Sequence, residues 1–222
     1  MTALVHYQLT LLLRSQRWLP PLLLYVAVIG VGVQQGQPLL DSLGYAAAAL
    51  LPVTAWLVRV CVTAEPEAAR HCAAAATGPA RAHLASVLAA LVGAGALGTA
   101  GTLGVAAVSD PRTTDGRVPV SQVAAAGSGL LAALVCALIG LAVGALGNRP
   151  LLRGTGWAVS GTLLGALLVL VVSVSPANAA VSGLVTASHE GTVPMPWLAL
   201  LGAVCLAAGA TALVCWLAPR RR

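Results

Sequence analysis

Titratable residues are concentrated in one short part of a chain that is otherwise apolar. The stretch EPEAARHCAAAATGPARAHL, residues 65–84, contains two glutamates, two arginines and two histidines. Residues 65–67 can begin a helix, because proline suits a first turn and carboxylates are favoured at the positive N-terminal end of a helix. Residues 68–76 are rich in alanine, a strong helix former, and the sequence Thr77-Gly78-Pro79 should end the helix. We therefore expect a short helix parallel to the membrane surface, followed by entry into an apolar segment.

Ser128 and His189 are the residues that could support covalent catalysis. A serine hydroxyl becomes a nucleophile when a neighbouring histidine accepts its proton. Ser128 lies in the sequence AAGSGLL, but the GxSG pattern of rhomboid-type proteases is broken because residue 126 is alanine. An intramembrane serine hydrolase or protease is therefore kept as an alternative, and we expect no catalytic residue in this chain.

No metal or cofactor site is expected in this chain. His71 and Cys72 are adjacent, so their side chains point in different directions on a helix, and His83 comes twelve residues after His71. The five cysteines form no CxxC pair, which argues against a zinc site or a disulfide framework. The chain contains no lysine, and a Walker A loop needs one to hold nucleotide phosphates. The chain cannot be a P-loop ATPase by itself.

The composition requires lipid as the solvent for most of the chain. Hydrophobic residues make up 59% and charged residues 8% of the sequence, whereas a typical soluble domain has about 25% charged residues. Six apolar segments are long enough, or nearly so, to cross ~30 Å of hydrocarbon as helices. The prediction is an all-α membrane protein with one transmembrane domain over residues 1–222. The expected spans are residues 18–33, 43–62, 84–108, 123–146, 157–174 and 197–217.

Arginine distribution predicts the orientation of these spans. Ten arginines fall on one side of the predicted membrane and two, Arg112 and Arg117, fall on the other. Cytoplasmic loops carry the excess of positive charge, so we expect both termini in the cytoplasm of a multi-pass protein of the inner or plasma membrane. The net charge of +6 is assigned to this topology, and no nucleic-acid partner is expected. The ten arginines are Arg14, Arg17, Arg59, Arg70, Arg81, Arg149, Arg153, Arg220, Arg221 and Arg222.

Residues 1–17 carry a polar stripe formed by Thr2, His6, Thr10, Arg14 and Arg17. This spacing is typical of an amphipathic helix that lies in the membrane interface, where basic residues meet anionic headgroups. A cytosolic extension of the first span is the alternative.

Residues 175–196 are unusually apolar for a connection outside the membrane. His189 and Glu190 are their only charged or titratable residues. We expect a re-entrant pair of short helices broken near Gly183, because non-helical backbone at this depth must be covered by protein or line a cavity. A hydrophobic surface loop is the alternative.

Two pairs of glycines have the spacing that allows helices to approach closely. They are Gly140 with Gly144 and Gly161 with Gly165. Small residues four apart let two helix backbones pack in lipid. The spans also lack an acidic or histidine residue at mid-membrane, which argues against a proton-driven carrier.

The segment of residues 65–84 resembles the loop after the second span of ABC-2-type transporter permeases, which often reads E-R-E-x-G-T-L-E-x-L-L-A-T-P-x-S-R. Glu65 and Glu67 match its acidic start, and the sequence ATGPAR at residues 76–81 is similar to its end, with Gly78 inserted or displaced. The family's glycine is replaced by Ala68 or Ala69, and the lysine that follows the motif is missing. An interfacial first helix, six spans and a re-entrant connection also resemble this family over nearly the whole chain.

The resemblance implies that residues 65–83 form a coupling helix on a separate cytosolic ABC ATPase, which binds ATP and Mg²⁺. A second permease copy, or a paralogue, would complete the transporter. The exported compound would be a lipid, drug or peptide, and small polar residues such as Thr99, Thr102, Ser160 and Thr162 would line its path. A non-transporting membrane anchor subunit is an alternative. Contacts to the ATPase would come from Glu65, Glu67, Arg70, Pro79, Arg81, Arg14 and Arg17.

Overall fold

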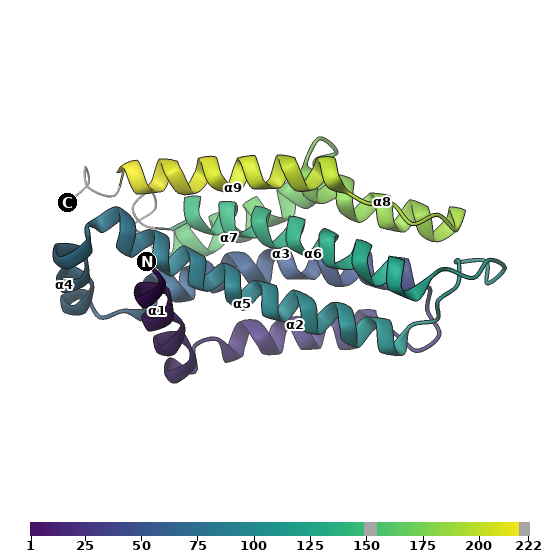
Figure 1. Ribbon diagram of the computed structural model, residues 1–222, viewed down its shortest axis with the longest axis horizontal. Helices are drawn as coiled ribbons and strands as arrows, with labels where there is room; N and C mark the ends of the chain where they lie inside the picture. The colour runs from purple at the N-terminus through teal and green to yellow at the C-terminus, as the bar shows by residue number, and fades with distance from the viewer. Residues whose placement is uncertain (149–154, 218–222) are drawn as a thin grey trace.

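The computed structural model describes residues 1–148 and 155–217, apart from the side chains of residue 67 and residues 155–159. The described part is an elongated helical bundle, as expected, with two short helices turned across its long axis at one end (Figure 1). The helices are α1 (Thr2–Ser15), α2 (Leu19–Gly32), α3 (Leu39–Ala64), α4 (Glu67–Thr77), α5 (Pro79–Val108), α6 (Gln122–Leu146), α7 (Thr155–Val171), α8 (Pro176–Glu190) and α9 (Trp197–Leu217).

Among the residues that the structure describes, four helices, α3, α5, α6 and α9, are long and apolar enough to cross a membrane, and α7 with α8 makes a fifth if the pair is one span. These helices support a multi-pass membrane protein. The expected first span is shorter than predicted, because α2 has 14 residues and covers roughly 21 Å at 1.5 Å per residue. Four to five of the six expected spans therefore meet the criteria of length and composition.

The connection between α7 and α8 differs from the expectation for residues 175–196. α8 is one continuous helix through Gly183, and the chain instead bends by 48° before it. Ser175 caps α8 by accepting a hydrogen bond from the Ala177 amide at 3.2 Å. Asn178 Nδ2 donates to the Leu170 carbonyl oxygen at 2.7 Å, which satisfies a carbonyl that the end of α7 leaves free. The expected break near Gly183 is wrong because proline and a capping serine fall earlier, at residues 175–176.

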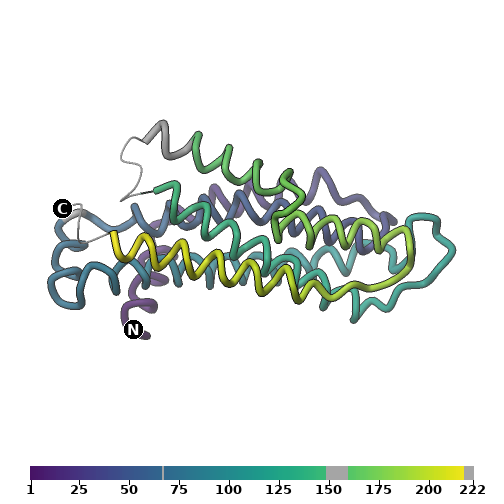
Figure 2. The backbone as a smooth tube through the Cα atoms, turned by 90° about the horizontal axis from the view of Figure 1, so that it is seen from above, coloured from purple at the N-terminus to yellow at the C-terminus, as the bar shows by residue number. Residues whose placement is uncertain are grey.

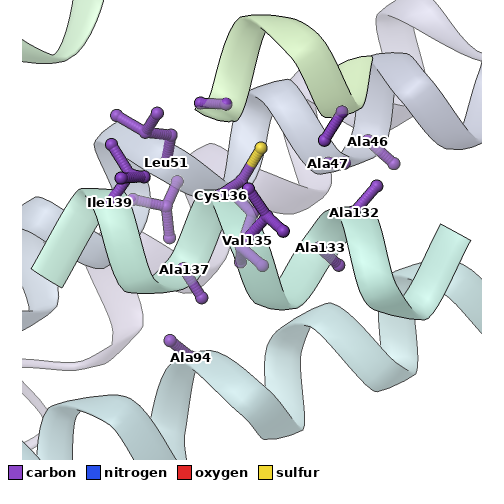
Figure 3. Packing of buried hydrophobic residues seen from close by; sticks show 14 of the residues in the cluster. Ala46, Ala47, Leu51, Ala94, Ala132, Ala133, Val135, Cys136, Ala137 and Ile139 are labelled. Atoms are coloured by element: carbon purple, nitrogen blue, oxygen red, sulfur yellow. The ribbon is translucent and has the colours of Figure 1, made fainter. Parts of the chain in front are cut away.

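The core is built around α3, which packs against both α5 and α6, and these two helices also pack against each other. Leu50, Leu51 and Val58 of α3 are fully buried. Figure 3 shows small residues of α6 at these contacts, with Ala137 pointing toward Ala94 of α5. Lipid provides no hydrophobic force between helices, so close van der Waals contact between small residues must hold the bundle together.

Gly140 and Gly144 lie where the backbone of α6 comes closest to α3. A Cβ at Gly144 would lie 2.9 Å from the Ala55 carbonyl oxygen, and a Cβ at Gly140 would lie even closer to the Leu51 carbonyl oxygen. The second glycine pair is different: Gly161 is exposed, while a Cβ at Gly165 would lie 3.2 Å from a methyl carbon of Val143.

At the end of the bundle opposite to α1 and α4, the segment between α5 and α6 forms a long loop (Figure 1) that is hydrogen-bonded to two helices. The Leu39 amide at the start of α3 donates to the Asp110 carbonyl oxygen at 3.0 Å. The Thr114 amide donates to the Ser188 carbonyl oxygen at 2.9 Å, so the segment between α5 and α6 is attached to both α3 and α8.

We predict that Gly140→Ala destabilises the bundle by roughly 1–3 kcal/mol, because the added carbon meets α3 backbone that cannot move aside. Gly127→Ala is the matched control in the same helix, since nothing lies within 4 Å of its added Cβ. Thermal unfolding of the detergent-purified protein measures both. Equal midpoints for the two variants would contradict a tight α3–α6 contact.

Candidate functional site

Local chemistry explains how α4 is placed across the end of the bundle. Glu65 is extended, with φ −79° and ψ 129°, as expected for a residue before proline. Gly78 has φ +89° and ψ 144°, a conformation that residues with a Cβ rarely adopt. Pro79 then starts α5. Two residues therefore connect α3 to α4, and a single glycine connects α4 to α5.

The carboxylate of Glu65 points into the protein. Glu65 is 7% exposed and accepts a hydrogen bond from Gln8 Nε2 at 3.2 Å. The hydroxyl of Tyr7 donates to the same carboxylate at 3.4 Å. Burial, the negative charge of Glu65 and the hydrogen bond to it raise the pKa of Tyr7 above its ordinary value. A buried charge must be paired or hydrogen-bonded, and here α1 supplies the donors.

The predicted contact of Glu65 to a partner stays a prediction, but its side chain is already used within the chain. Glu65 connects α1 to the junction of α3 and α4 and has little surface left for another protein. Arg17 of the N-terminal stripe also contacts this junction, because its Nη1 donates to the Thr63 carbonyl oxygen at 3.3 Å. Arg14 is exposed and remains available to a partner or to lipid headgroups. The predicted contact through the Glu67 side chain lies outside the described residues, and so do Arg149, Arg153 and Arg220 to Arg222.

The outward face of α4 is made of four small residues and one histidine. Ala74 points inward and is 6% exposed, whereas the exposed positions follow the helical period. Arg70 and Pro79 are half-buried, and Arg81 is exposed just beyond α4. The exposed surface, which we call the α4 face, consists of Ala68, His71, Cys72, Ala75 and Ala76. Sequence reasoning from charge missed it, although the spacing of these residues would have indicated it.

A cavity of about 260 Å³ lies between α2, α3 and α7. Its walls are apolar except for Arg59 and Thr162. Of the residues expected to line a path, Thr162 borders this cavity, whereas Thr102 is buried and Thr99 bonds back to the Gly95 carbonyl oxygen of its own helix at 2.8 Å. Ser160 is exposed. The lining residues are Leu24, Pro52, Ala55, Trp56, Arg59, Thr162 and Leu163.

Arg59 is held beside the start of the connection after α6. Its Nη1 donates to Asn148 Oδ1 at 3.1 Å. Asn148 is 3% exposed, and its Nδ2 donates to the Gly144 carbonyl oxygen at 2.6 Å. This arrangement fixes a cation at the edge of an apolar cavity, a feature that composition alone did not reveal.

Ser128 and His189, the two residues considered for catalysis, lie in different surroundings, one buried and one exposed. Ser128 is fully buried, and its hydroxyl donates to the Pro194 carbonyl oxygen. His189 is exposed on α8. Within residues 1–148 and 155–217, no group of three or more histidine, cysteine, aspartate or glutamate side chains could hold a metal ion.

Comparison of the chain with known proteins gave no match to a protein-family model, a curated protein or a solved structure. Two features of the described chain bear on its function. One is the α4 face on a helix joined closely to α3 and α5. The other is the apolar cavity with Arg59 at its edge.

We predict that Glu65→Ala loosens α1, because Gln8 loses a buried partner. Hydrogen bonds to a charged group contribute about 1.5–3 kcal/mol, so amide exchange in residues 2–15 should rise by roughly tenfold or more. Glu65→Gln keeps an acceptor oxygen and should fall between this variant and the wild type. Hydrogen–deuterium exchange makes the measurement, with Glu190→Ala, which changes an exposed carboxylate, as the control. Unchanged exchange in Glu65→Ala would show that α1 is held by other contacts.

Proposed function

We propose that this chain is the permease subunit of an ABC-2-type transporter that exports a hydrophobic or amphipathic compound. The carrying observation is the placement of α4, which crosses the end of the bundle and is joined to α3 and α5 by two residues and one residue. Such short joints leave little freedom, so a force on α4 would move the ends of both spans. ATP and Mg²⁺ would bind a separate cytosolic subunit, because this chain lacks the Walker A lysine.

The α4 face suggests how that subunit would be recognised. Small side chains allow a partner to approach the helix backbone closely, whereas long charged side chains would keep it at a distance. We therefore infer a largely apolar cleft on the ATPase, with Arg70 and Arg81 adding charge-assisted contacts beside it. Arg14 would contact the same subunit or anionic headgroups.

The orientation proposed from the sequence agrees with the grouping of the arginines in space. Arg14, Arg17, Arg70 and Arg81 belong to α1, α4 and the chain next to them, which share one end of the bundle (Figure 2). Arg112 and Arg117 lie in the segment between α5 and α6 at the opposite end. The first end would then be cytoplasmic in the plasma membrane, by the positive-inside rule.

A bent span is the arrangement that we propose for α7 and α8, in place of a re-entrant hairpin. α8 continues along the bundle in the direction of α7 in both views (Figures 1 and 2), and a hairpin would require it to turn back. With α2 as a short span, six crossings would leave both termini on the same side.

A second copy of the chain, or a paralogue, would pair with this one to enclose the path. The apolar side of α7 supports this proposal, since Leu164 and Leu168 are 60% and 61% exposed. The contact made by Ser128 does not favour the serine hydrolase. The anchor subunit remains distinguishable, because its partner ATPase would not respond to any exported compound.

Cys72 provides a test of orientation. It is exposed on the α4 face, so a membrane-impermeant maleimide should label it in inside-out vesicles and leave it unlabelled in right-side-out vesicles. The variant Cys72→Ala is the control for labelling of the other cysteines. Labelling from the outside alone would overturn the proposed topology and with it the docking of an ATPase.

Docking itself is tested by Ala75→Arg, which puts a long side chain on the α4 face. We expect co-purification of the ATPase subunit, and transport, to fall at least tenfold while the permease remains folded, because Ala75 is exposed. Asp115→Arg, an exposed change at the other end, should have no effect. The variants Arg70→Ala and Arg81→Ala should lose less than Ala75→Arg does. Full retention of the ATPase by Ala75→Arg would exclude α4 as its docking site.

A further inference from the structure

We propose that the cavity between α2, α3 and α7 binds a single-chain anionic amphiphile, with its hydrocarbon chain against Leu24 and Trp56 and its charged head at Arg59. This inference rests on the proposed permease function, because it names the chemical class of the exported compound. Three features support it: the charge of Arg59, the hydrogen bond to Asn148 that holds Arg59 in place, and the size and opening of the cavity.

Arg59 has a positive charge that lacks a carboxylate partner in the described part of the chain. Its guanidinium donates to the neutral amide oxygen of Asn148. The ion pair found in residues 1–148 and 155–217, between Asp110 and Arg112, belongs to the loop at the opposite end of the bundle. A guanidinium has five N–H donors in a planar fork that matches carboxylate, sulfate or phosphate oxygens, and Asn148 uses one of them. An anion at this position would supply both the missing charge and the missing acceptors.

The position of Arg59 is set by packing. Asn148 is buried and bonded to the Gly144 carbonyl oxygen, and Gly144 itself lies against Ala55 and Val58 of α3. Arg59 follows Val58 directly in α3. A basic side chain that merely extended toward headgroups would stay mobile, whereas this one is held at the mouth of the cavity by the contact between α3 and α6.

The cavity opens toward lipid and has room for part of one hydrocarbon chain. Leu24, Trp56 and Leu163 line it and are 41%, 39% and 52% exposed, so its rim is on the apolar outer surface of the bundle. Its volume of about 260 Å³ is below the ~300–1,000 Å³ typical of sites for drug-sized molecules. Arg59 precedes the end of α3 at Ala64 by five residues, which is about 7.5 Å along the helix. A charged head at that depth could stay near the membrane surface while the chain enters the cavity sideways.

Trp56 makes binding measurable by fluorescence. Dibrominated stearate, an anionic single-chain amphiphile that quenches tryptophan, is titrated into the detergent-purified permease at alkaline pH, at which the acid is ionised. Its methyl ester is the neutral matched probe. The contribution of Trp56 is the difference between wild type and Trp56→Phe. We expect stearate to quench Trp56 with at least tenfold higher affinity than the ester does.

Substitution of Arg59 then tests the role of the charge. Arg59→Gln should lower the affinity for stearate at least tenfold and leave the ester unchanged, which also shows that the cavity is intact. Arg59→Lys should keep most of the preference for the acid. Equal affinity of the wild type for both probes would overturn the proposal without any variant, and so would full stearate binding by Arg59→Gln. Recovery of Trp56 fluorescence on addition of an equal concentration of unbrominated two-chain phosphatidylglycerol, which would show displacement of the brominated stearate, would overturn the single-chain assignment.

The result of the stearate-binding experiment can be distinguished from the result of the ATPase-docking experiment. Binding is measured on the permease alone, so loss of the anion preference leaves the docking result for Ala75→Arg unaffected. Conversely, a chain that binds stearate but never retains an ATPase would keep this site and lose its assignment to a transporter.

Discussion

The close approach of α3 and α6 is the contact on which the rest of the structure depends. Glycine at residues 140 and 144 lets the two backbones meet, with the space for a Cβ already occupied by α3. The same contact places Asn148 and therefore orients Arg59 at the edge of the cavity. α3 in turn carries the α4 junction at its end. The single α3–α6 interface thus supports both candidate sites. In lipid, where the hydrophobic effect does not drive helices together, close packing of this kind is what holds them in contact.

The end of the bundle that holds α1 and α4 depends on a different interaction, a buried carboxylate with donors from a distant segment. Glu65 draws Gln8 and Tyr7 onto the junction between α3 and α4, and Arg17 adds a bond to the last turn of α3. α1 is therefore attached to the element that would receive force from a partner. Glu65 and Arg17, which the sequence offers as charged contacts, are used inside the protein, whereas Arg14 and Arg81 stay exposed beside the mostly small side chains of the α4 face.

Local signals predicted most of the helices. The last span was placed at residues 197–217, where α9 lies, and α4 followed from alanine content and from the break at Gly78 and Pro79. The inward direction of Glu65 could not be predicted, because its partner Gln8 lies 57 residues away in the chain. The continuity of α8 was missed because a glycine in mid-helix was weighted above the serine and proline that begin it. The cavity joins residues from three helices, and no pattern in one segment indicates such a site.

The hydrogen bond between the Leu39 amide and the Asp110 carbonyl oxygen connects the first residue of α3 mechanically to the loop between α5 and α6. α3 is 26 residues long, or about 39 Å, and is attached at its first residue to the loop between α5 and α6. That loop is attached in turn to the C-terminal end of α8. An axial shift of α3 would therefore pull on the loop between α5 and α6, and through that loop on the end of α8, so these two backbone hydrogen bonds join three helix ends into one mechanical unit.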